Sequence, residues 1–503
     1  MATGHAQHVW GVKAVTCACS SRPQRHPSSQ CVKARNTERR DPWRKTSQRR
    51  SFSTSTLSCR TDARSAENWF ERMPTEILRK ILAYLDAASI FCIGHVSKKF
   101  SELANDNALW YRMYAREFQG KGFRSKRMNT VVEGMNFTSI QEKPTGYWKK
   151  LYFRKLSGYD ESKWKRQLKD ISPYTGLPIL TEQVLRSLHV KWEITITEKG
   201  GKESSLQQSR AYFSGSSVTV CWSSGSLPIL YSVSSLKLHG VMRAPLGCSG
   251  VSKPGWRSLM AEFSGESIQK SARFLGSDNF IKLLYLDPGC VIGIWQDQWS
   301  MAFIMVNLHF QQLVERSLLG SSLCPYALPE KKAVFDDVDP EYGLHGYTLH
   351  ILLHNTVENI MSGRFSQLRC KKDEIQKGFI KLTAISREKL SQHSPLSGKF
   401  HLPWRSEFLN GSVENTFMMS LTLLDDAQTP FWCVSSPVSM TVCRPEWVSY
   451  DYDGDHYYTR YQDAEGKVKM NFVWLKEHNQ FFIINLAVYL TTAKVNNHFR
   501  RSY

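Results

Sequence analysis

The sequence has few cysteines, and this shortage excludes two classes of protein. Its 12 cysteines among 503 residues are scattered singly after Cys17 and Cys19. A structural zinc site needs ligands in close pairs so that four donors reach one tetrahedron. A secreted disulfide framework needs denser cysteines and a secretory signal peptide, and the sequence shows neither pattern. We therefore expect a reducing compartment, in which most cysteines are small buried apolar residues.

Long apolar runs are lacking as well, and acidic residues are scarce near the N-terminus. The longest apolar run, Phe481 to Leu490, has ten residues and contains Asn485, whereas a bilayer-spanning helix needs about 20. We expect a soluble protein without membrane insertion. Residues 1–65 hold 13 lysines and arginines against 3 acidic residues, so they supply +10 of the formal net charge of +21. The basic balance is therefore weak evidence for a nucleic-acid-binding domain.

The sequence also lacks the common catalytic and metal-binding motifs, including the phosphate loop, the His-Glu-x-x-His helix and the nucleophile elbow. His350 and His354 would share a strand face but stand roughly 13 Å apart, too far for one ion. Asp451–Asp455 resembles a calcium loop, but Gln462 takes the twelfth position, where a bidentate Glu is needed. No activating neighbours surround the later cysteines Cys324, Cys370, Cys433 and Cys443. We predict no catalytic residue, no metal site and no cofactor.

Residues 1–66 are rich in Ser, Arg, Thr and Gln and have almost no hydrophobic periodicity. This composition predicts a disordered basic tail. An Arg- and Ser-rich, acid-poor N-terminus also suits mitochondrial import, and paired basic residues suit nuclear targeting. The charges do not line one face of an amphipathic helix, so we rank import below disorder and expect a cytoplasmic and/or nuclear protein.

Residues 67–118 carry the pattern of a three-helix module. Pro74 suits the first helical position, and Asp86 can end this helix and cap the next. Asn107 is the expected cap of a last helix that contains Leu109 and Trp110. The first helix has a broad apolar face formed by Ile77, Leu78, Ile81, Leu82 and Leu85.

So small a module cannot easily bury this much apolar surface alone. Each large apolar side chain left in water forgoes ~1.5–3 kcal/mol. We expect the module to complete its core against a partner protein. The alternative is that it packs against the β-rich region of its own chain.

Together these residues resemble the F-box family. The resemblance covers Met73–Leu78, Ile81–Asp86, Val96–Phe100 and Leu109–Trp110. Met73 stands where leucine is commoner and Phe100 where tryptophan is commoner, and both keep a bulky apolar side chain. Further short motifs resemble one subgroup of this family over most of the chain after residue 66, among them Gly146–Lys150, Pro173–Pro178, Asn307–Phe310, Glu341–Tyr347 and Asp463–Gly466.

The resemblance implies an adaptor role without catalysis. F-box proteins dock on the Skp adaptor, which links them to a cullin scaffold in an SCF (Skp–cullin–F-box) ubiquitin ligase. The chain would be the substrate-recognition subunit, recruiting target proteins for ubiquitination through its β-rich C-terminal region. The Skp-adaptor-binding residues that the resemblance implies are Pro74, Ile77, Leu78, Ile81, Leu82, Leu85, Val96, Phe100, Leu109 and Trp110. The substrate-binding residues are unknown at this point.

From about residue 190 the hydrophobic period changes from helical to alternating. Short runs of β-branched and aromatic residues separated by Gly, Pro, Asn and Asp predict antiparallel strands in a sandwich or a barrel. The fold class is therefore α+β. The predicted domains are a tail at 1–66, an F-box at 67–118, a linker with helix at 119–187, a first β unit at 188–323, a connector at 324–342 and a second β unit at 343–503.

Two segments of the β region resemble two others, which predicts a duplicated β unit at roughly 188–318 and 343–499. Trp295–Leu308 and Trp474–Leu486 each read as a strand ending in Trp, a polar turn and then Phe-x-x-x-Asn-Leu. Pro228–Ser235 loosely resembles Pro430–Ser436. The alternative is that hairpins of buried strands often look alike.

A rival interpretation is a basic nucleic-acid-binding protein that uses the three-helix module as a helix-turn-helix. Such a protein exposes Lys, Arg, Asn and Gln on its recognition helix. The last helix here is instead expected to expose a mixed set, Tyr111, Arg112, Arg116 and Glu117, so a nucleic-acid partner is disfavoured. An enzyme with a β-barrel pocket lacks any supporting set of residues.

Overall fold

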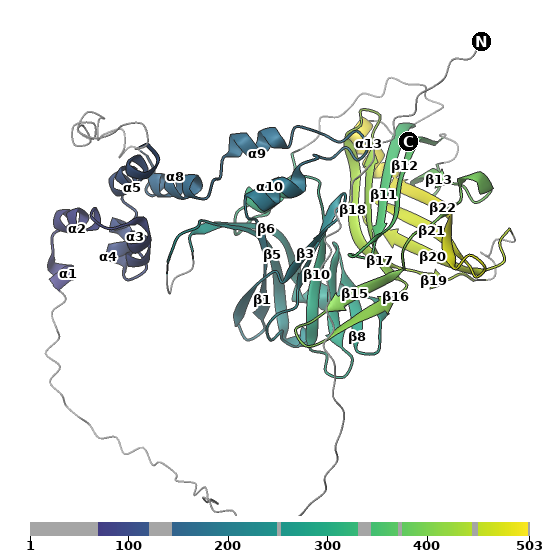
Figure 1. Cartoon of the computed structure of the whole chain (residues 1–503), viewed down its shortest axis with the longest axis horizontal. Coiled ribbons are helices and arrows are strands. Elements are labelled where there is room, and N and C mark those ends of the chain that lie inside the picture. The colour runs from purple at the N-terminus through teal and green to yellow at the C-terminus, as the bar shows by residue number, and fades with distance from the viewer. Residues whose placement is uncertain are drawn as a thin grey trace, which may run out of the picture. The chain divides into compact units, whose positions relative to one another are not determined.

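The computed structural model describes residues 69–119, 143–248, 253–329, 344–370, 375–444 and 451–500. Helices come first and antiparallel strands follow, so the predicted α+β class is confirmed (Figure 1). The tail predicted at 1–66 and much of the connector predicted at 324–342 lie outside the described residues.

The N-terminal module contains more and shorter helices than the predicted three. Ser97 accepts a hydrogen bond from the Phe100 backbone and starts one additional helix, because a hydroxyl at the N-cap satisfies a free N–H. The helices are α1 (Trp69–Arg72), α2 (Thr75–Leu82), α3 (Ala87–Ile93), α4 (Lys98–Leu103) and α5 (Asn107–Tyr114), followed by a π-helical turn, η1 (Ala115–Gln119).

The predicted linker is helical where the structure describes it. Asp160 caps one of its helices by accepting from the Lys163 backbone at 3.2 Å. The segment from Pro173 to Pro178 makes the expected turn, closed by the Ser172 N–H donating to the Leu177 carbonyl at 2.9 Å. The helices are α8 (Tyr147–Leu156), α9 (Glu161–Gln167) and α10 (Thr181–Ser187).

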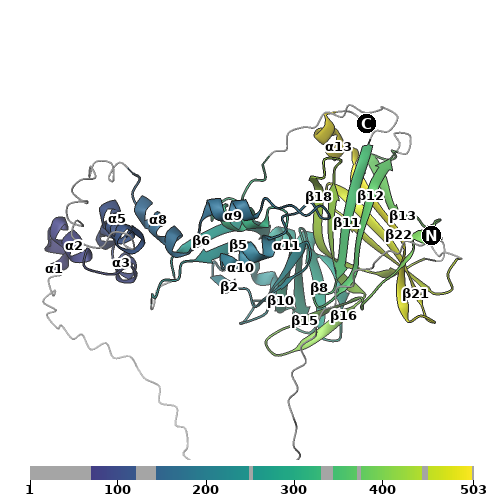
Figure 2. The same ribbon diagram turned by 45° about the horizontal axis from the view of Figure 1, so that its top comes forward.

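The first β unit consists of two open antiparallel sheets, with strand orders β2-β1-β5-β6 and β3-β4-β10-β9-β8-β7. Helix α11 (Gly265–Ser271) lies beside β5 and β6 (Figure 2), and α12 (Leu313–Leu318) follows the last strand. The strands are β1 (Lys191–Glu198), β2 (Glu203–Gln207), β3 (Arg210–Phe213), β4 (Ser217–Trp222), β5 (Val233–Arg243), β6 (Gly255–Ser264), β7 (Arg273–Ser277), β8 (Ile281–Leu286), β9 (Cys290–Trp295) and β10 (Met301–His309).

The second β unit is built in the same way, with orders β12-β11-β17-β18 and β13-β22-β21-β20-β19. A separate β15-β16 hairpin is inserted before β17, and α13 (Thr492–Phe499) ends the unit. The strands are β11 (Leu344–His354), β12 (Asn359–Cys370), β13 (Phe379–Ile385), β14 (Ser394–Pro395), β15 (His401–Arg405), β16 (Asn410–Glu414), β17 (Thr416–Leu424), β18 (Pro430–Ser439), β19 (Thr441–Val442), β20 (Asp455–Gln462), β21 (Gly466–Leu475) and β22 (Gln480–Thr491).

The two strand orders coincide, as a duplicated unit predicts. Strands β1, β2, β5 and β6 correspond to β11, β12, β17 and β18, and β4, β10, β9, β8 and β7 correspond to β13, β22, β21, β20 and β19. The similar hairpins found in the sequence are the equivalent pairs β9-β10 and β21-β22. The second similarity was wrong: Pro228 precedes β5, whereas Pro430 begins β18, which corresponds to β6.

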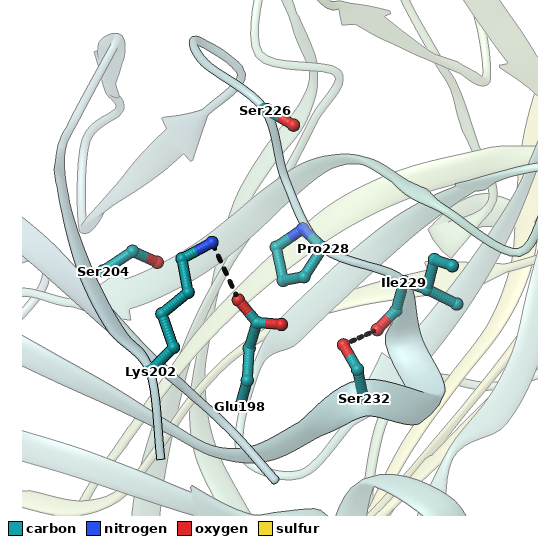
Figure 3. Close-up of a pocket in the computed structure, with 7 residues that line it drawn as sticks. All are labelled: Glu198, Lys202, Ser204, Ser226, Pro228, Ile229 and Ser232. Carbon is teal, nitrogen blue, oxygen red and sulfur yellow. Dashed lines mark hydrogen bonds and ion pairs between the residues drawn. The ribbon is translucent and has the colours of Figure 1, made fainter. Parts of the chain in front are cut away.

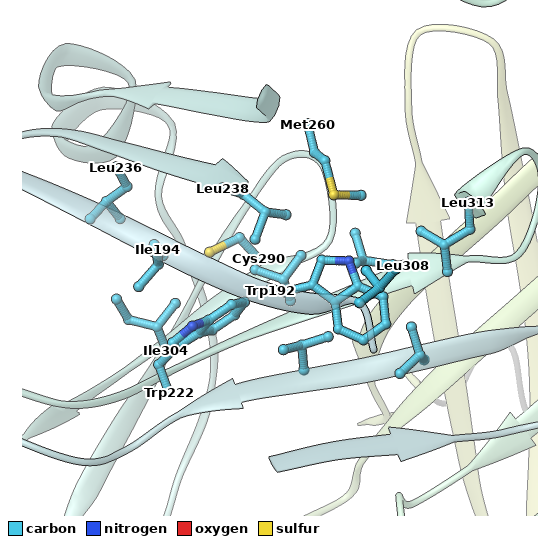
Figure 4. Packing of buried hydrophobic residues seen from close by; sticks show 14 of the residues in the cluster. Trp192, Ile194, Trp222, Leu236, Leu238, Met260, Cys290, Ile304, Leu308 and Leu313 are labelled. Atoms are coloured by element: carbon cyan, nitrogen blue, oxygen red, sulfur yellow. The ribbon is translucent and has the colours of Figure 1, made fainter. Parts of the chain in front are cut away.

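Each unit buries one core between its two sheets. In the first unit Trp192 and Ile194 of β1 and Trp222 of β4 are almost fully buried in the same cluster (Figure 4). Both sheets have edge strands, so each unit is an open two-sheet arrangement and the barrel alternative was wrong. The alternation of inward apolar residues fixes which face of each strand packs against the opposite sheet.

A second apolar cluster and a few buried hydrogen bonds join the two units. Phe303 of β10 stacks against Trp404 of β15 with ring centroids 5.6 Å apart, and both side chains are buried. The Trp404 indole N–H donates to Asp278 at 2.6 Å. The buried His309 and Thr422 side chains are hydrogen-bonded across the two units at 3.0 Å. The outer face of the first six-stranded sheet is therefore an internal interface.

Replacing Gly240 with Ala is expected to destabilise the first unit. A Cβ at Gly240 would lie 2.6 Å from the Cα and 2.8 Å from the carbonyl carbon of Ser317 in α12. Because these are backbone atoms, relief requires the helix to move, which typically costs about 1–3 kcal/mol. Urea unfolding measures this loss. Gly200→Ala is the control, because no heavy atom lies within 4 Å of its added Cβ; equal stabilities of the two variants would contradict the expectation.

His309 should make the stability of the protein depend on pH. Burial, Arg316 and His350 lower the pKa of His309 from 6.5 to about 3. The unfolded chain therefore takes up a proton first, and stability is lost as the pH falls from 6.5 toward 3. Between pH 6.5 and 5.5 the wild type should lose about 1 kcal/mol more unfolding free energy than His309→Gln. Urea titrations at both pH values test this, and equal losses would refute it.

Candidate functional site

The start of each helix in the N-terminal module is set by a local contact. Pro74 was predicted to be the first helical residue, but it is the N-cap of α2, which begins one residue later at Thr75. Asp86 accepts from the Ser89 N–H at 3.0 Å and caps α3, as predicted. Hydrogen bonding by Ser89 lowers the pKa of the Asp86 carboxyl. The carboxylate therefore stays ionised at the positive end of α3, which stabilises the helix start.

The predicted cap at Asn107 was wrong by one residue. Asp106 caps α5 by accepting from the Ala108 N–H at 2.8 Å, and it also pairs with Arg79 of α2 at 2.9 Å. The Asn107 amide instead donates to the Lys143 and Pro144 carbonyls at 2.8 and 3.1 Å. Asn107 thus holds the chain that leads into α8 against the start of α5.

Four of the ten predicted docking residues lie inside the protein. Leu78, Leu82, Leu109 and Trp110 are buried in one cluster with residues of α8. The Trp110 indole N–H donates to the Ala104 carbonyl at 2.6 Å. The ring centroid of Trp110 lies 5.3 Å from that of Tyr152 and 5.1 Å from that of Phe153, both in α8. These four side chains form part of the core beneath the exposed face of α2, and in this structure they are not accessible to a partner.

The module is closed by its own chain at two places, one in the linker and one in the β region, as the alternative interpretation of the sequence held in part. Helix α8 covers one side through Tyr152 and Phe153. Ala244 and Leu246, which follow β5, are buried in the same cluster. The expectation that a partner protein must complete this core was therefore wrong in part, because the linker and the β region supply some of the cover.

Polar groups of the linker helix are also buried against the module. The Lys149 ammonium lies 5.4 Å from the Phe91 ring centroid and 5.9 Å from that of Trp110, and it donates to Asn105 at 2.8 Å. Burial lowers the pKa of Lys149. Tyr152 donates to the Glu117 carboxylate, and burial together with this bond raises the pKa of Tyr152.

Part of the surface that remains exposed is apolar, and it includes some of the predicted docking residues. Ile77 and Ile81 are 44% and 41% exposed, and they lie one turn apart on α2, so they share a face. Val96 is 72% exposed in the turn before α4. Pro74 is exposed, and Leu85 and Phe100 are partly buried. Tyr84, which was not predicted, is 90% exposed; its position beside the predicted Leu85 could have indicated it.

The last helix does not present the surface that a recognition helix would need. Tyr111, expected to be exposed, is buried, with its ring centroid 4.7 Å from that of Trp148. Arg112, Arg116 and Glu117 are exposed as predicted. Tyr111 is covered because α8 packs on α5, a contact that no local pattern reveals.

A recess of about 320 Å³ lies in the first β unit, and its lining is poorly suited to catalysis. It is lined by three serines, two apolar residues and one ion pair, in which the Glu198 carboxylate lies 3.4 Å from the Lys202 ammonium (Figure 3). The two charges neutralise each other, and the recess contains no nucleophile paired with a base. Among the described residues no group of three His, Cys, Asp or Glu side chains could hold a metal ion.

The described part of the chain contains no helix long and apolar enough to cross a membrane.

Comparisons with known proteins agree with the geometry of the N-terminal module. The F-box-like family model matches residues 70–116. F-box only protein 15 of Macaca fascicularis is 39% identical over 438 residues, covering 86% of this chain and 100% of the relative. The Homo sapiens protein of that name is 38% identical, covering 86% of each chain. The Mus musculus protein is 35% identical, covering 85% of this chain and 100% of the relative.

The likeness to solved structures is much weaker. The crystal structure of MucB in complex with MucA(peri) aligns with 68% of this chain and 98% of its own at 7% identity, with a TM-score of 0.09, too low to bear on the fold. Identity over most of the chain, together with the matched F-box-like module, is what assigns the protein. This chain belongs to the F-box only protein 15 family.

Proposed function

We propose that this F-box protein is the substrate-recognition subunit of an SCF ubiquitin ligase and has no catalytic activity of its own. The exposed apolar face of α2 carries the proposal. Ile77 and Ile81 remain in water there although the module already has a complete core beneath them. Packing within the chain therefore does not account for this face, whereas docking on the Skp adaptor would bury it.

The energetics of this face suit a specific interface. Burying a large aliphatic side chain contributes ~1.5–3 kcal/mol relative to full exposure, and these side chains are only partly exposed to begin with. A few central apolar anchors usually carry most of the affinity of an interface. Ile77, Ile81 and Val96 are the anchors that the structure leaves available; Pro74 is also exposed, and Leu85 and Phe100 are partly exposed.

The cullin scaffold and the protein substrate are further partners in this proposal. The cullin would be reached through the Skp adaptor, and no surface of this chain is assigned to it. The substrate would bind the β-rich region, whose two units supply most of the surface outside the F-box. Recruitment in this arrangement needs binding sites and no chemistry from this chain, which fits a recess lined by a neutralised ion pair, three serines and two apolar residues.

The docking surface is tested by the triple variant Ile77→Ser, Ile81→Ser and Val96→Ser. Affinity for the purified Skp adaptor should fall at least about tenfold, because the apolar anchors are lost. The matched control is Ile171→Ser, Ile179→Ser and Val442→Ser. These residues are 48%, 62% and 69% exposed, so the same chemistry is removed elsewhere. Unfolding curves should match for both variants, and unchanged adaptor binding would refute the docking surface.

The same pair of variants tests the ligase role in cells treated with a proteasome inhibitor. Proteins captured by the wild type should be ubiquitinated, and the docking variant should capture them without ubiquitination. The control variant should behave as the wild type does. Ubiquitination that persists with the docking variant would contradict the SCF role.

We also propose that the protein acts in the cytoplasm and/or nucleus. The scattered cysteines support a reducing compartment, and none of the eight cysteines that the structure describes forms a disulfide bond. A fluorescent protein fused to residues 1–66 should give a cytoplasmic or nuclear image, and a mitochondrial pattern would overturn this localisation.

A further inference from the structure

One face of the second β unit carries four basic residues on neighbouring strands. Lys381 of β13 lies opposite Tyr489 of β22, and Tyr489 lies opposite Lys467 of β21. Two positions further along β21, Lys469 lies opposite Arg460 of β20. These strands are neighbours in the sheet β13-β22-β21-β20-β19, seen in Figure 1. The register therefore gathers the four cations on one patch, the basic face.

Along each of these strands buried and exposed side chains alternate, and this alternation places the basic face on the side of the sheet away from the core. Leu382, Val468 and Val488, each one position from a residue of the patch, are fully buried in the core of the unit. Because successive side chains of a strand point to opposite sides, their neighbours must leave the core. Lys381, Lys469 and Arg460 are exposed, and Lys467 is partly exposed.

The basic face has no acidic partners among the described residues. Neither Lys381, Lys467, Lys469 nor Arg460 forms an ion pair there. Burial first, and then the charges of Arg460, Lys467 and Lys381, lower the pKa of Lys469. Like charges on adjacent strands destabilise a sheet. The arrangement costs stability unless an anion is bound to it.

Aromatic rings position two of the ammonium groups. The Lys467 ammonium lies 3.5 Å from the ring centroid of Phe379, and that of Lys469 lies 4.9 Å from the centroid of Tyr489. Cation–π attraction holds each charge over the sheet. It also covers the ring faces on which nucleobases would have to stack. The geometry therefore favours carboxylates over a single-stranded nucleic acid.

The duplicated fold shows that this face is a specialised one. In the first unit the outer face of the corresponding sheet carries the apolar residues Leu283, Phe303 and Met305. They are buried against Trp404 and Met418 of the second unit. One copy of the sheet thus uses its outer face to join the units, and the other carries cations on the equivalent surface.

We propose that the basic face binds an acidic, extended segment of the protein substrate. The carboxylates of the segment would accept hydrogen bonds from the ammonium and guanidinium groups, and its backbone would cross the strands. The inference rests on the proposed function only for the statement that the partner is a ubiquitination substrate. The charge complementarity is independent of adaptor docking, so the binding can be measured without the Skp adaptor.

Direct binding of a peptide tests the proposal. The probe is a fluorescein-labelled peptide of alternating Glu and Ser, about eight residues long, which at ~3.3 Å per residue can cross four strands spaced ~4.8 Å apart. Fluorescence anisotropy is measured with the full chain. The triple variant Lys381→Gln, Lys467→Gln and Lys469→Gln should bind at least about tenfold more weakly than the wild type. A peptide with Gln in place of Glu should bind neither protein measurably.

The matched control removes three other exposed lysines, Lys163→Gln, Lys169→Gln and Lys191→Gln. Both variants lose the same charge and keep the basic N-terminal residues, so non-specific attraction cancels between them. Equal weakening in the two variants, or equal affinity of the wild type for the Glu and Gln peptides, would overturn the proposal. So would binding of a labelled single-stranded oligonucleotide, and not of the Glu peptide, through the same lysines. Adaptor binding that persists throughout would show that the proposed function stands even if this inference fails.

Discussion

The shared core between a four-stranded and a six-stranded sheet is the interaction on which each β unit depends. Neither sheet can exist alone, because one of its faces is almost wholly apolar. Trp192, Trp222 and Leu238 show this in the first unit, where the two sheets meet around them. Once the inner faces are paired, the outer faces become free to differ. The outer faces of two units with the same strand order can therefore make different contacts within a single chain.

The two outer faces of the six-stranded sheets differ in this way. The first is apolar and is closed by the second unit around Phe303 and Trp404. Buried polar contacts such as Tyr285 with Ser436 at 3.1 Å add direction to that apolar interface, because a hydrogen bond is satisfied in only one register. The outer face of the second carries the basic residues Lys381, Lys467, Lys469 and Arg460.

Local signals in the sequence predicted local structure well. The similarity of Trp295–Leu308 and Trp474–Leu486 predicted two equivalent hairpins, and Asp86 was recognised as a cap because capping involves residues only three apart. The accessible part of the docking surface was less predictable. Trp110 has the same position on its helix whether α8 covers it or a partner does, and the covering residues Tyr152 and Leu246 are distant in sequence. The basic face required strand register, since Lys381 and Lys467 become neighbours only across β22.

Helix α8 and the chain after β5 cover part of the F-box core, so the F-box module is not structurally independent of the rest of the chain. Its hydrophobic core is assembled from three separate stretches of sequence, near Trp110, near Phe153 and near Leu246. Removing residues 69–119 would expose aromatic side chains of the linker, such as Phe153, and leave an apolar surface in water. The linker helix α8 is thus part of the F-box core in physical terms. The F-box module and the β region are coupled through a core that they share.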